Sequence, residues 1–261
     1  MSSFSDYAPY YDLFYSGKDY KAESAFVLGL LRERKASVTS ILELGCGTGG
    51  HAVHFAESGC SVLGVDLSQR MVELAHERFR SLPTNLQKQF RGFQGDASNF
   101  FPPEKVDAVV SLFHVASYQV SDEALQGFFR SASSALDAGG LFVFDFWYGP
   151  AVLSDRPHAR ERREIANDGT LVVRSTEPVM RFEENVVDVN YAFSIRVSDV
   201  EHSFNETHRM RYLFVPEIRM HAELAGFALE ESAAWMNRQP LNDASWYGYA
   251  VLRKTAKPTS V

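Results

Sequence analysis

The sequence is poor in cysteine, has no long hydrophobic run and carries no excess of basic residues. Its 261 residues include two cysteines, Cys46 and Cys60, and no Cys-x-x-Cys pair. This excludes a disulfide framework and favours a cytoplasmic location. No stretch approaches the ~18 consecutive apolar residues of a membrane-spanning helix, and the run Leu141–Phe144 is cut by Asp145. The first six residues hold neither a basic nor an apolar segment, so we expect no signal peptide.

The charge balance is acidic. Lys and Arg total 26 and Asp and Glu total 33, which gives a net charge of −7. This balance argues against nucleic acid or an anionic membrane surface as the main partner. Residues 151–211 contain no lysine, so arginine alone supplies their strongly basic side chains. Arginine can bind phosphate or carboxylate through two parallel hydrogen bonds, although arginine–glutamate pairs on a solvated strand face would also explain most of them.

The first 150 residues have the pattern of a parallel sheet. Continuous apolar segments alternate with helical segments, and we predict strands at 38–44, 61–65, 90–94, 106–113 and 141–146. Strands that are apolar throughout are typical of a sheet covered by helices on both faces. Because parallel crossovers are right-handed, the sheet should be doubly wound, with its ligand beyond the carboxyl ends of the strands.

The pattern changes after Pro150. Apolar and polar residues alternate from here on. Turn signals occur at Asn167-Asp168-Gly169, Glu183-Glu184-Asn185 and Ser198-Asp199. Three or four antiparallel strands are expected there. A helix at 216–226 and strands at 227–231 and 246–252 then resume the earlier pattern. We therefore predict an α/β fold: a doubly wound, mostly parallel seven-stranded sheet from residues 1–150 and 213–261, with an antiparallel layer inserted at 151–212.

A glycine-rich turn after the first strand fits two cofactors. Gly45, Gly47 and Gly50 match the dinucleotide fingerprint G-x-G-x-x-G, and Gly45, Gly47 and Gly49 match the E/D-x-G-x-G-x-G loop that binds S-adenosylmethionine (SAM). Both cofactors require a tight turn that lies against the ligand. In both, an acid about 20 residues further on binds ribose hydroxyls, and Asp66 occupies that position. These residues alone do not choose between the two.

Glu43 favours SAM. A carboxylate two positions before the first glycine would repel a pyrophosphate, whereas SAM carries an ammonium and a sulfonium and no phosphate. Asp96, after the third strand, fits a residue that binds the adenine amino group, with Leu67 and Ala97 flanking the ring. Asp96 could instead cap a helix at 97–100.

On these motifs, the sequence resembles class I SAM-dependent methyltransferases over essentially its whole length, through Ile41–Gly50, Gly64–Ser68, Gly95-Asp96 and Ala138–Val143. A narrower likeness links it to bacterial N,N-dimethyltransferases of nucleotide-linked amino sugars. Its segments are Tyr11-Asp12-Leu13, Gly17–Tyr20, Phe113–Tyr118, Phe146–Pro150 and His202–Phe214. Where that family has Trp-Trp-Phe-Pro, this chain has Trp147-Tyr148-Gly149-Pro150.

The resemblance implies a Rossmann-like methyltransferase fold with an aromatic N-terminal lid, and a homodimer formed through the inserted layer. It implies that Tyr11 and Tyr20 lie along the methionine part of SAM and that Tyr7 lies near the acceptor. Trp147 and Tyr148 would line the acceptor pocket, and Arg209, Arg211 or Arg174 would bind a nucleotide diphosphate. The cofactor set implied in full is Tyr11, Tyr20, Glu43, Gly45, Cys46, Gly47, Gly49, Asp66, Leu67, Asp96, Ala97 and Phe113.

Methyl transfer to an amine requires a free lone pair, so a base near the acceptor helps. His208, Tyr7 and His114 are the candidates to accept or relay the proton. Histidine suits this role because its side chain titrates near neutral pH. His208 could instead be an exposed strand histidine. We expect no metal: His51 and His54 have helical spacing but no evident third ligand, and a polar helix face explains them.

Three other functions remain open on the sequence. The acceptor could be another small polar molecule, such as a sugar hydroxyl or an amino acid amine. The chain could bind SAM without transferring a methyl group. An NAD-dependent oxidoreductase is the most distant alternative. The expected function is SAM-dependent methylation of a nucleotide-linked amino sugar, with S-adenosylhomocysteine as the product.

Overall fold

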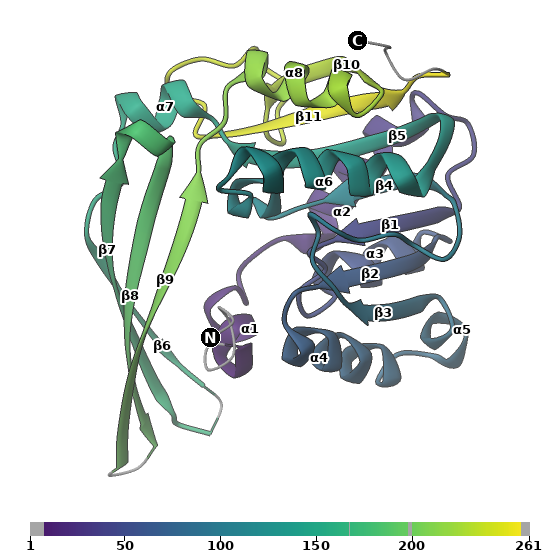
Figure 1. Cartoon of the computed structure of the whole chain (residues 1–261). Coiled ribbons are helices and arrows are strands. Elements are labelled where there is room, and N and C mark those ends of the chain that lie inside the picture. Colours follow the sequence, from purple (N-terminus) through teal and green to yellow (C-terminus); the bar gives the residue numbers. More distant parts are fainter. Residues whose placement is uncertain (1–7, 167, 198–199, 257–261) are drawn as a thin grey trace.

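Two β-sheets organise the molecule (Figure 1). The computed structural model describes residues 8–166, 168–197 and 200–256, without the side chains of residues 8–10. The larger sheet has seven strands in the order β10-β11-β5-β4-β1-β2-β3. Their bounds are β1 Ser40–Leu44, β2 Ser61–Asp66, β3 Phe90–Gln94, β4 Val106–Ser111, β5 Leu136–Trp147, β10 Phe227–Ala234 and β11 Tyr247–Lys254. β11 is antiparallel to both its neighbours, β10 and β5, and the other neighbouring pairs in this sheet are parallel.

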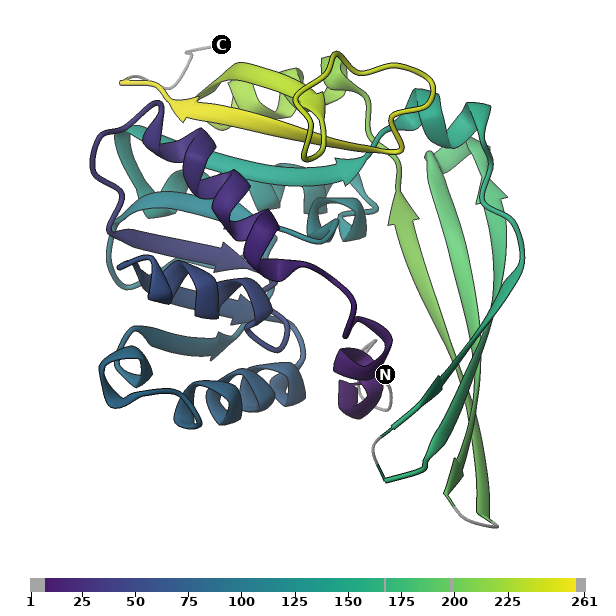
Figure 2. The same ribbon diagram turned by 180° about the vertical axis from the view of Figure 1, so that it is seen from behind.

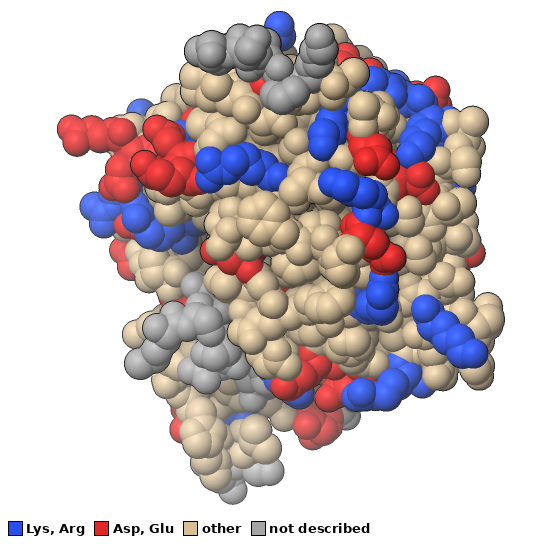
Figure 3. Space-filling model, turned by 45° about the vertical axis from the view of Figure 1, so that its right-hand side comes forward, with Lys and Arg blue, Asp and Glu red and all other residues tan. Residues whose placement is uncertain are grey.

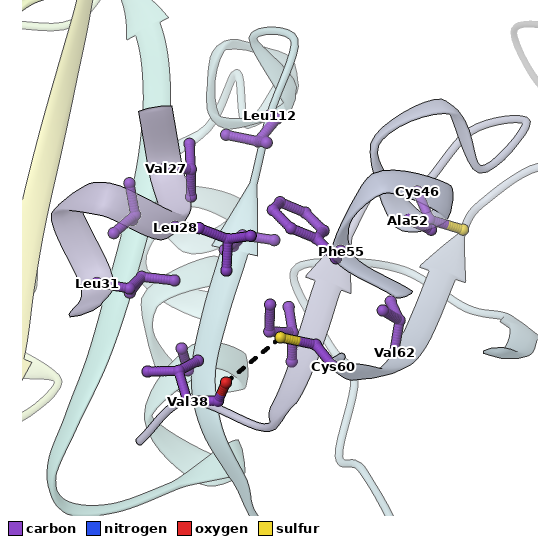
Figure 4. Close-up of a cluster of buried hydrophobic side chains, with 14 of the residues drawn as sticks. Val27, Leu28, Leu31, Val38, Cys46, Ala52, Phe55, Cys60, Val62 and Leu112 are labelled. Carbon is purple, nitrogen blue, oxygen red and sulfur yellow. Dashed lines mark hydrogen bonds between the residues drawn. The ribbon is translucent and has the colours of Figure 1, made fainter. Parts of the chain in front are cut away.

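Helices cover both faces of the large sheet, which confirms the predicted doubly wound α/β fold (Figures 1 and 2). One face packs against α2 (Tyr20–Arg32), α3 (Gly50–Glu57) and α4 (Gln69–Arg80), and the short α5 (Thr84–Gln87) follows α4. The other face packs against α6 (Asp122–Ala135) and α8 (Val215–Leu224). Figure 4 shows the first of these cores, where Leu28 and Phe55 pack over the sheet. Because β1 to β5 are parallel to one another, their carboxyl ends lie at one edge of the sheet.

Both cysteines are buried and free. Cys60 Sγ lies 3.4 Å from the carbonyl oxygen of Val38 and donates a hydrogen bond to it (Figure 4).

Charged side chains of both signs are interspersed on the face shown in Figure 3. Among the described residues, no helix is long and apolar enough to cross a membrane.

Residues 138–140, which precede the predicted strand 141–146, lie within β5. The strand pairs with β4 at Leu136 and again at Leu141, while β4 advances only from Val106 to Ala108. The extra residues form a bulge, and Gly139 supplies a φ of +85° there. The sequence pattern did not predict four short helices: α1 (Ala8–Phe14), α7 (Gly149–Ser154), and the 3₁₀ helices Val115–Tyr118 and Phe182–Glu184.

The inserted segment forms a separate four-stranded antiparallel sheet in the order β6-β7-β8-β9. Its strands are β6 Arg160–Ile165, β7 Leu171–Arg181, β8 Val186–Val197 and β9 Val200–Arg211. The predicted turn at 183–185 is present, and Asn185 adopts a φ of +55° after it. Asn167 and Ser198-Asp199, in the other two predicted turns, lie outside the described residues.

Helix α1 lies between the two sheets (Figures 1 and 2). Phe14 is fully buried and packs against Val172, Phe193 and Ile195 of the inserted sheet. On its other side, Asp12 accepts a hydrogen bond from Thr48 Oγ1 at 2.8 Å and pairs with Arg78 at 2.5 Å. The helix thus ties the inserted sheet to the glycine-rich loop that contains Thr48.

Candidate active site

A cavity of about 640 Å³ lies at the carboxyl edge of the parallel strands and extends to the inner face of the inserted sheet. Most predicted site residues line it: Tyr11, Gly45, Gly47, Asp66, Leu67, Asp96, Ala97, Phe113, His114, Trp147, His208 and Arg209. The predicted site residues that do not line it are Tyr20, Glu43, Cys46, Gly49, Tyr148, Arg174 and Arg211. Tyr7 lies outside the described residues.

The three glycines of the loop after β1 meet different surroundings. All three have positive φ: +78° at Gly45, +52° at Gly47 and +78° at Gly49. A Cβ at Gly45 would come within 2.4 Å of the Val115 side chain, and one at Gly49 would lie 3.3 Å from Ala75 Cβ of α4. A Cβ at Gly47 would meet no protein atom within 4 Å, although Gly47 lines the cavity. Gly49 therefore serves helix packing, whereas Gly47 leaves open space on the cavity side.

The acidic strand ends lie beside this loop. Asp66, at the end of β2, accepts hydrogen bonds of 2.9 Å from the backbone N–H groups of Gly47 and Ser68. Burial raises the pKa of Asp66, and these two N–H donors oppose the rise. Asp96 accepts hydrogen bonds of 2.8 Å from both the N–H and the hydroxyl of Ser98. Residues 97–100 form a turn and no helix, so the alternative of a helix cap at Asp96 is wrong. Leu67 is 59% exposed at the cavity wall, which leaves an apolar surface for a planar ring.

Three predicted cofactor residues lie behind the loop rather than in the cavity wall. Cys46 points toward β2, where its Sγ would be 2.8 Å from a Cβ at Gly64. Tyr20 packs its ring against Gly50 and His51, and its buried hydroxyl has no hydrogen-bond partner among the described residues. Glu43 is 1% exposed, and its Oε2 likewise finds no partner in the described part of the chain.

His51 was expected on a polar helix face, and this is wrong, because the residue is 5% exposed. Its Nε2 lies 2.8 Å from Glu23 Oε2, and its Nδ1 lies 3.6 Å from Glu43 Oε1. Burial opposes the charge on His51, but the two carboxylates outweigh it and raise its pKa. Burial raises the pKa of Glu43, and His51 opposes that rise. The His51 ring thus lies between the carboxyl groups of Glu23 and Glu43, beneath the glycine loop.

We expect this cluster to make stability depend on pH. A histidine whose folded pKa is raised stabilises the fold fully below its unfolded pKa of about 6.5 and loses that effect as pH rises through the folded pKa. Glu43 acts in the same direction, since its folded pKa is also raised. His51→Gln should lower the free energy of unfolding by about 1–3 kcal/mol near pH 6 and flatten its decline toward about pH 9. Urea denaturation across this range measures both effects.

The control for this prediction is His54→Gln, on the same helix. His54 pairs with Glu57 at the more exposed side, at 2.8 Å. This variant should keep the pH slope of the wild type. A His51→Gln protein with an unchanged slope would show that the buried cluster does not set the pH dependence.

At the other end of the cavity, His208 lies between two polar partners. It is 3% exposed, and its ring packs edge-on against Tyr191. Its Nδ1 lies 2.7 Å from the Tyr118 hydroxyl and its Nε2 lies 3.0 Å from Glu206 Oε2. Burial holds the pKa of Tyr118 well above its usual range, so this phenol stays protonated. The three groups form a hydroxyl–imidazole–carboxylate chain whose Tyr118 and His208 members line the cavity.

His114 is fixed at the cavity wall by Asp145. Its backbone N–H donates to Asp145 Oδ1 at 2.9 Å, and its Nδ1 lies 2.7 Å from Asp145 Oδ2. Its ring stacks on Tyr247 with centroids 4.5 Å apart. Both Phe113 and His114 have positive φ, 63° and 65°. Two successive side chains in this conformation cost free energy, of order 1–3 kcal/mol each, and such strain clusters at functional sites.

Aromatic side chains form most of the remaining wall. Tyr15 packs between Tyr11 and Phe113, tilted against the first ring and edge-on to the second, with a centroid distance of 4.8 Å to each. Trp147 lines the cavity, and its buried indole N–H has no acceptor among the described residues. Tyr148 instead packs on the hydrophobic core near Phe146.

The three arginines predicted to bind a diphosphate are engaged elsewhere. Arg209 lines the cavity, but its guanidinium pairs with Glu184 and Asp188. Arg211 is 7% exposed and pairs with Asp122 and Glu217. Arg174 lies among the rings of Phe14, Tyr15 and Tyr191 at 4.6–6.0 Å. Ligand atoms of Asp122, Glu217 and His221 lie close enough together to hold a metal ion, but the Arg211 guanidinium pairs with both carboxylates.

The fold and the cavity together define a class of protein. A doubly wound sheet whose first loop is glycine-rich, and whose next two strands end in acids facing one cavity, is the architecture of class I SAM-dependent methyltransferases. Residues 41–140 match the family described as "Methyltransferase domain".

Individual relatives narrow this class. The dTDP-3-amino-3,4,6-trideoxy-alpha-D-glucopyranose N,N-dimethyltransferase of Streptomyces venezuelae is 30% identical over 227 residues, covering 86% of this chain and 91% of that protein. The dTDP-3-amino-3,6-dideoxy-alpha-D-glucopyranose N,N-dimethyltransferase of Streptomyces fradiae is 27% identical, covering 85% and 84%. The X-ray structure of the sugar N-methyltransferase KedS8 from Streptoalloteichus sp ATCC 53650 matches with a TM-score of 0.78 and 25% identity, covering 94% and 92%.

The chain belongs to the SAM-dependent methyltransferase family that includes these dTDP-amino-sugar N,N-dimethyltransferases. This confirms the resemblance seen in the sequence. The protein is an enzyme of the EC 2.1.1 type, its cofactor is SAM and the product formed from it is S-adenosylhomocysteine.

The residues around the glycine loop fit this cofactor. The open space beside Gly47 would be filled by a Cβ, so the loop is shaped for a ligand at close approach. Behind the loop, the buried Glu43 Oε2 has no hydrogen-bond partner among the described residues. Asp66 lies beside Gly47 and lines the cavity, and an acid at this position favours SAM over a phosphate-bearing cofactor.

Proposed function

We propose that the protein methylates the amino group of a nucleotide-linked deoxyamino sugar. One observation carries this proposal: a single cavity joins the glycine loop to the Tyr118–His208–Glu206 chain of the inserted sheet. The relatives support the acceptor class, since two of them are named for methylation of dTDP-linked 3-amino sugars. Two parts of the molecule would thus bind the two substrates.

For the cofactor, we propose the residues that line the loop end of the cavity. Gly45 and Gly47 would lie against it, Asp66 would bind its ribose, and Asp96 would bind its adenine between Leu67 and Ala97. Tyr11 and Phe113 would enclose its methionine part. When bound, SAM supplies a methyl group on a sulfonium. The aromatic wall excludes water from the reacting centres, and positioning of this kind is worth up to about 7–11 kcal/mol.

For the acceptor, we propose that the Tyr118–His208–Glu206 chain removes the ammonium proton. The Tyr118 hydroxyl would accept a proton from the amine while it donates its own to His208 Nδ1. Nε2–H of His208 donates to Glu206, whose carboxylate stabilises the imidazolium. The neutral phenol acts as a relay, because its raised pKa excludes a resident phenolate. Trp147 would donate its free indole N–H to a sugar oxygen. His114 and Tyr7 remain alternative proton acceptors.

The two substrates would be bound by different parts of the chain. We propose that residues 1–150 and 213–261 bind SAM, with α1 as part of an aromatic lid, and that residues 151–212 hold the acceptor. A homodimer through the inserted sheet and a cytoplasmic location complete the proposal. Sedimentation of the purified protein would test the dimer.

A turnover assay tests the proposed function. The protein is incubated with SAM and four kinds of acceptor, and products are counted by mass spectrometry: dTDP-linked amino sugars, dTDP-linked neutral sugars, free amino sugars and amino acids. We expect methyl increments on dTDP-linked amino sugars only. Increments on neutral sugars would move the assignment to O-methylation, and increments on free amines would remove the nucleotide from the requirement. Bound SAM left intact with every acceptor would favour a non-catalytic role.

A further inference from the structure

The register of the inserted sheet places polar residues in one row across its inner face. Arg160 of β6 pairs with Thr176 of β7, Thr176 with Tyr191 of β8, and Tyr191 with Glu206 of β9. Neighbouring strands lie about 4.8 Å apart, so the row spans about 14 Å between its end Cα atoms. Glu206 holds His208 at one end, and Arg160 supplies a positive charge at the other.

Arg160 differs from the arginines around it. It lines the cavity, and it forms no ion pair or hydrogen bond among the described residues. On the same strand, Arg162 pairs with Glu164 and Arg163 pairs with Glu161. The other arginine of the cavity wall, Arg209, is held by two carboxylates. The sequence could not single out Arg160, because the other arginines of the insert look the same in the chain.

The charge of Arg160 reaches two tyrosines of the cavity wall. Burial raises the pKa of Tyr191 to about 12, and the positive charge of Arg160 opposes that rise. Burial also raises the pKa of Tyr247, and Arg160 again opposes it. Both tyrosines line the cavity, so the field of Arg160 extends into it. The positive charge at this end of the wall is therefore available to an anionic ligand.

We propose that Arg160 binds the diphosphate of the nucleotide-linked acceptor and so sets the orientation of the sugar. This inference rests on the proposed function. A guanidinium binds two phosphate oxygens through parallel, charge-assisted hydrogen bonds. With the diphosphate at Arg160, the amine of the same molecule lies toward Tyr118 and His208. An acceptor with a negative and a positive end matches a row with Arg160 at one end and Glu206 at the other.

Direct binding tests this assignment without turnover. Isothermal titration measures dTDP, thymidine and SAM against the wild type, Arg160→Ala, Arg160→Lys and Arg163→Ala. We expect Arg160→Ala to weaken dTDP binding by about 10- to 100-fold and to leave thymidine and SAM unchanged. Arg160→Lys should recover part of the loss. Arg163 is the matched control, because it is on the same strand, faces the opposite side and is paired with Glu161.

The outcomes separate this assignment from the proposed function. Equal dTDP affinity in the wild type and Arg160→Ala, or no dTDP binding by the wild type, would overturn the role of Arg160. An equal loss of thymidine binding would also overturn it, since that result indicates a disturbed fold. Selective loss of dTDP binding supports Arg160 even if the turnover assay shows no methylated amino sugar, in which case only the proposed function fails.

Discussion

Gly47→Ala is expected to abolish SAM binding and to leave the fold in place. The structure has room for the new Cβ, which would meet no protein atom within 4 Å. The φ of +52° costs an alanine about 1–2 kcal/mol of stability. Because the Cβ would enter the space that the cofactor uses, SAM affinity should fall by more than about 100-fold. Titration calorimetry with SAM and a thermal melt of the same sample measure the two effects.

Gly59→Ala is the matched control for this variant. Gly59 follows α3 and has a φ of +90°, and a Cβ at this position would also meet no atom within 4 Å. It does not line the cavity. Both variants should lose similar stability, and only Gly47→Ala should lose SAM. If both bind SAM like the wild type, the ligand does not approach the loop at Gly47.

The sequence allowed the large sheet to be predicted because its signals are local. Serine is a common helix-capping residue, and the hydroxyls of Ser68 and Ser121 accept from the N–H groups of Met71 and Ala124 at the starts of α4 and α6. Strands that are apolar throughout marked the parallel sheet. Helix α1 was missed for a physical reason. It packs on both sides, with Phe14 against the inserted sheet and Tyr11 toward the cavity, and so shows no one-sided apolar stripe.

The cofactor end of the site was easier to predict than the acceptor end. The loop and the acids after β2 and β3 lie close in sequence and follow fixed spacings. One of the two partners of His208, Tyr118, lies 90 residues away in the sequence. Glu206 could have been found, since a residue two positions from His208 on a strand shares its face. The burial of His51 could not be predicted for the same reason. Its partners Glu23 and Glu43 come from other elements, and their carboxyl groups make its burial possible.

His208→Gln is expected to lower kcat for an amine acceptor by about 10²- to 10⁴-fold, the usual contribution of a positioned base. The KM for SAM should change little, because His208 belongs to the inserted sheet and lies at the other end of the cavity from the glycine loop. The loss should shrink as pH rises, since alkyl ammonium groups deprotonate in solution well above neutral pH. Steady-state kinetics from about pH 7 to about pH 10 measure this convergence.

Two further variants separate a chemical role from a structural one. His202→Gln changes an exposed histidine on the same strand and should keep the wild-type kcat. Glu206→Gln keeps a hydrogen-bond acceptor for Nε2 but removes its charge, so kcat should fall by less than in His208→Gln. A His208→Gln enzyme whose kcat stays low at every pH would not be explained by loss of a proton acceptor, and His114 would then become the base to test. Convergence at high pH in His208→Gln, with a smaller effect in Glu206→Gln, fits a chain in which the imidazole takes the proton and the carboxylate stabilises the resulting charge.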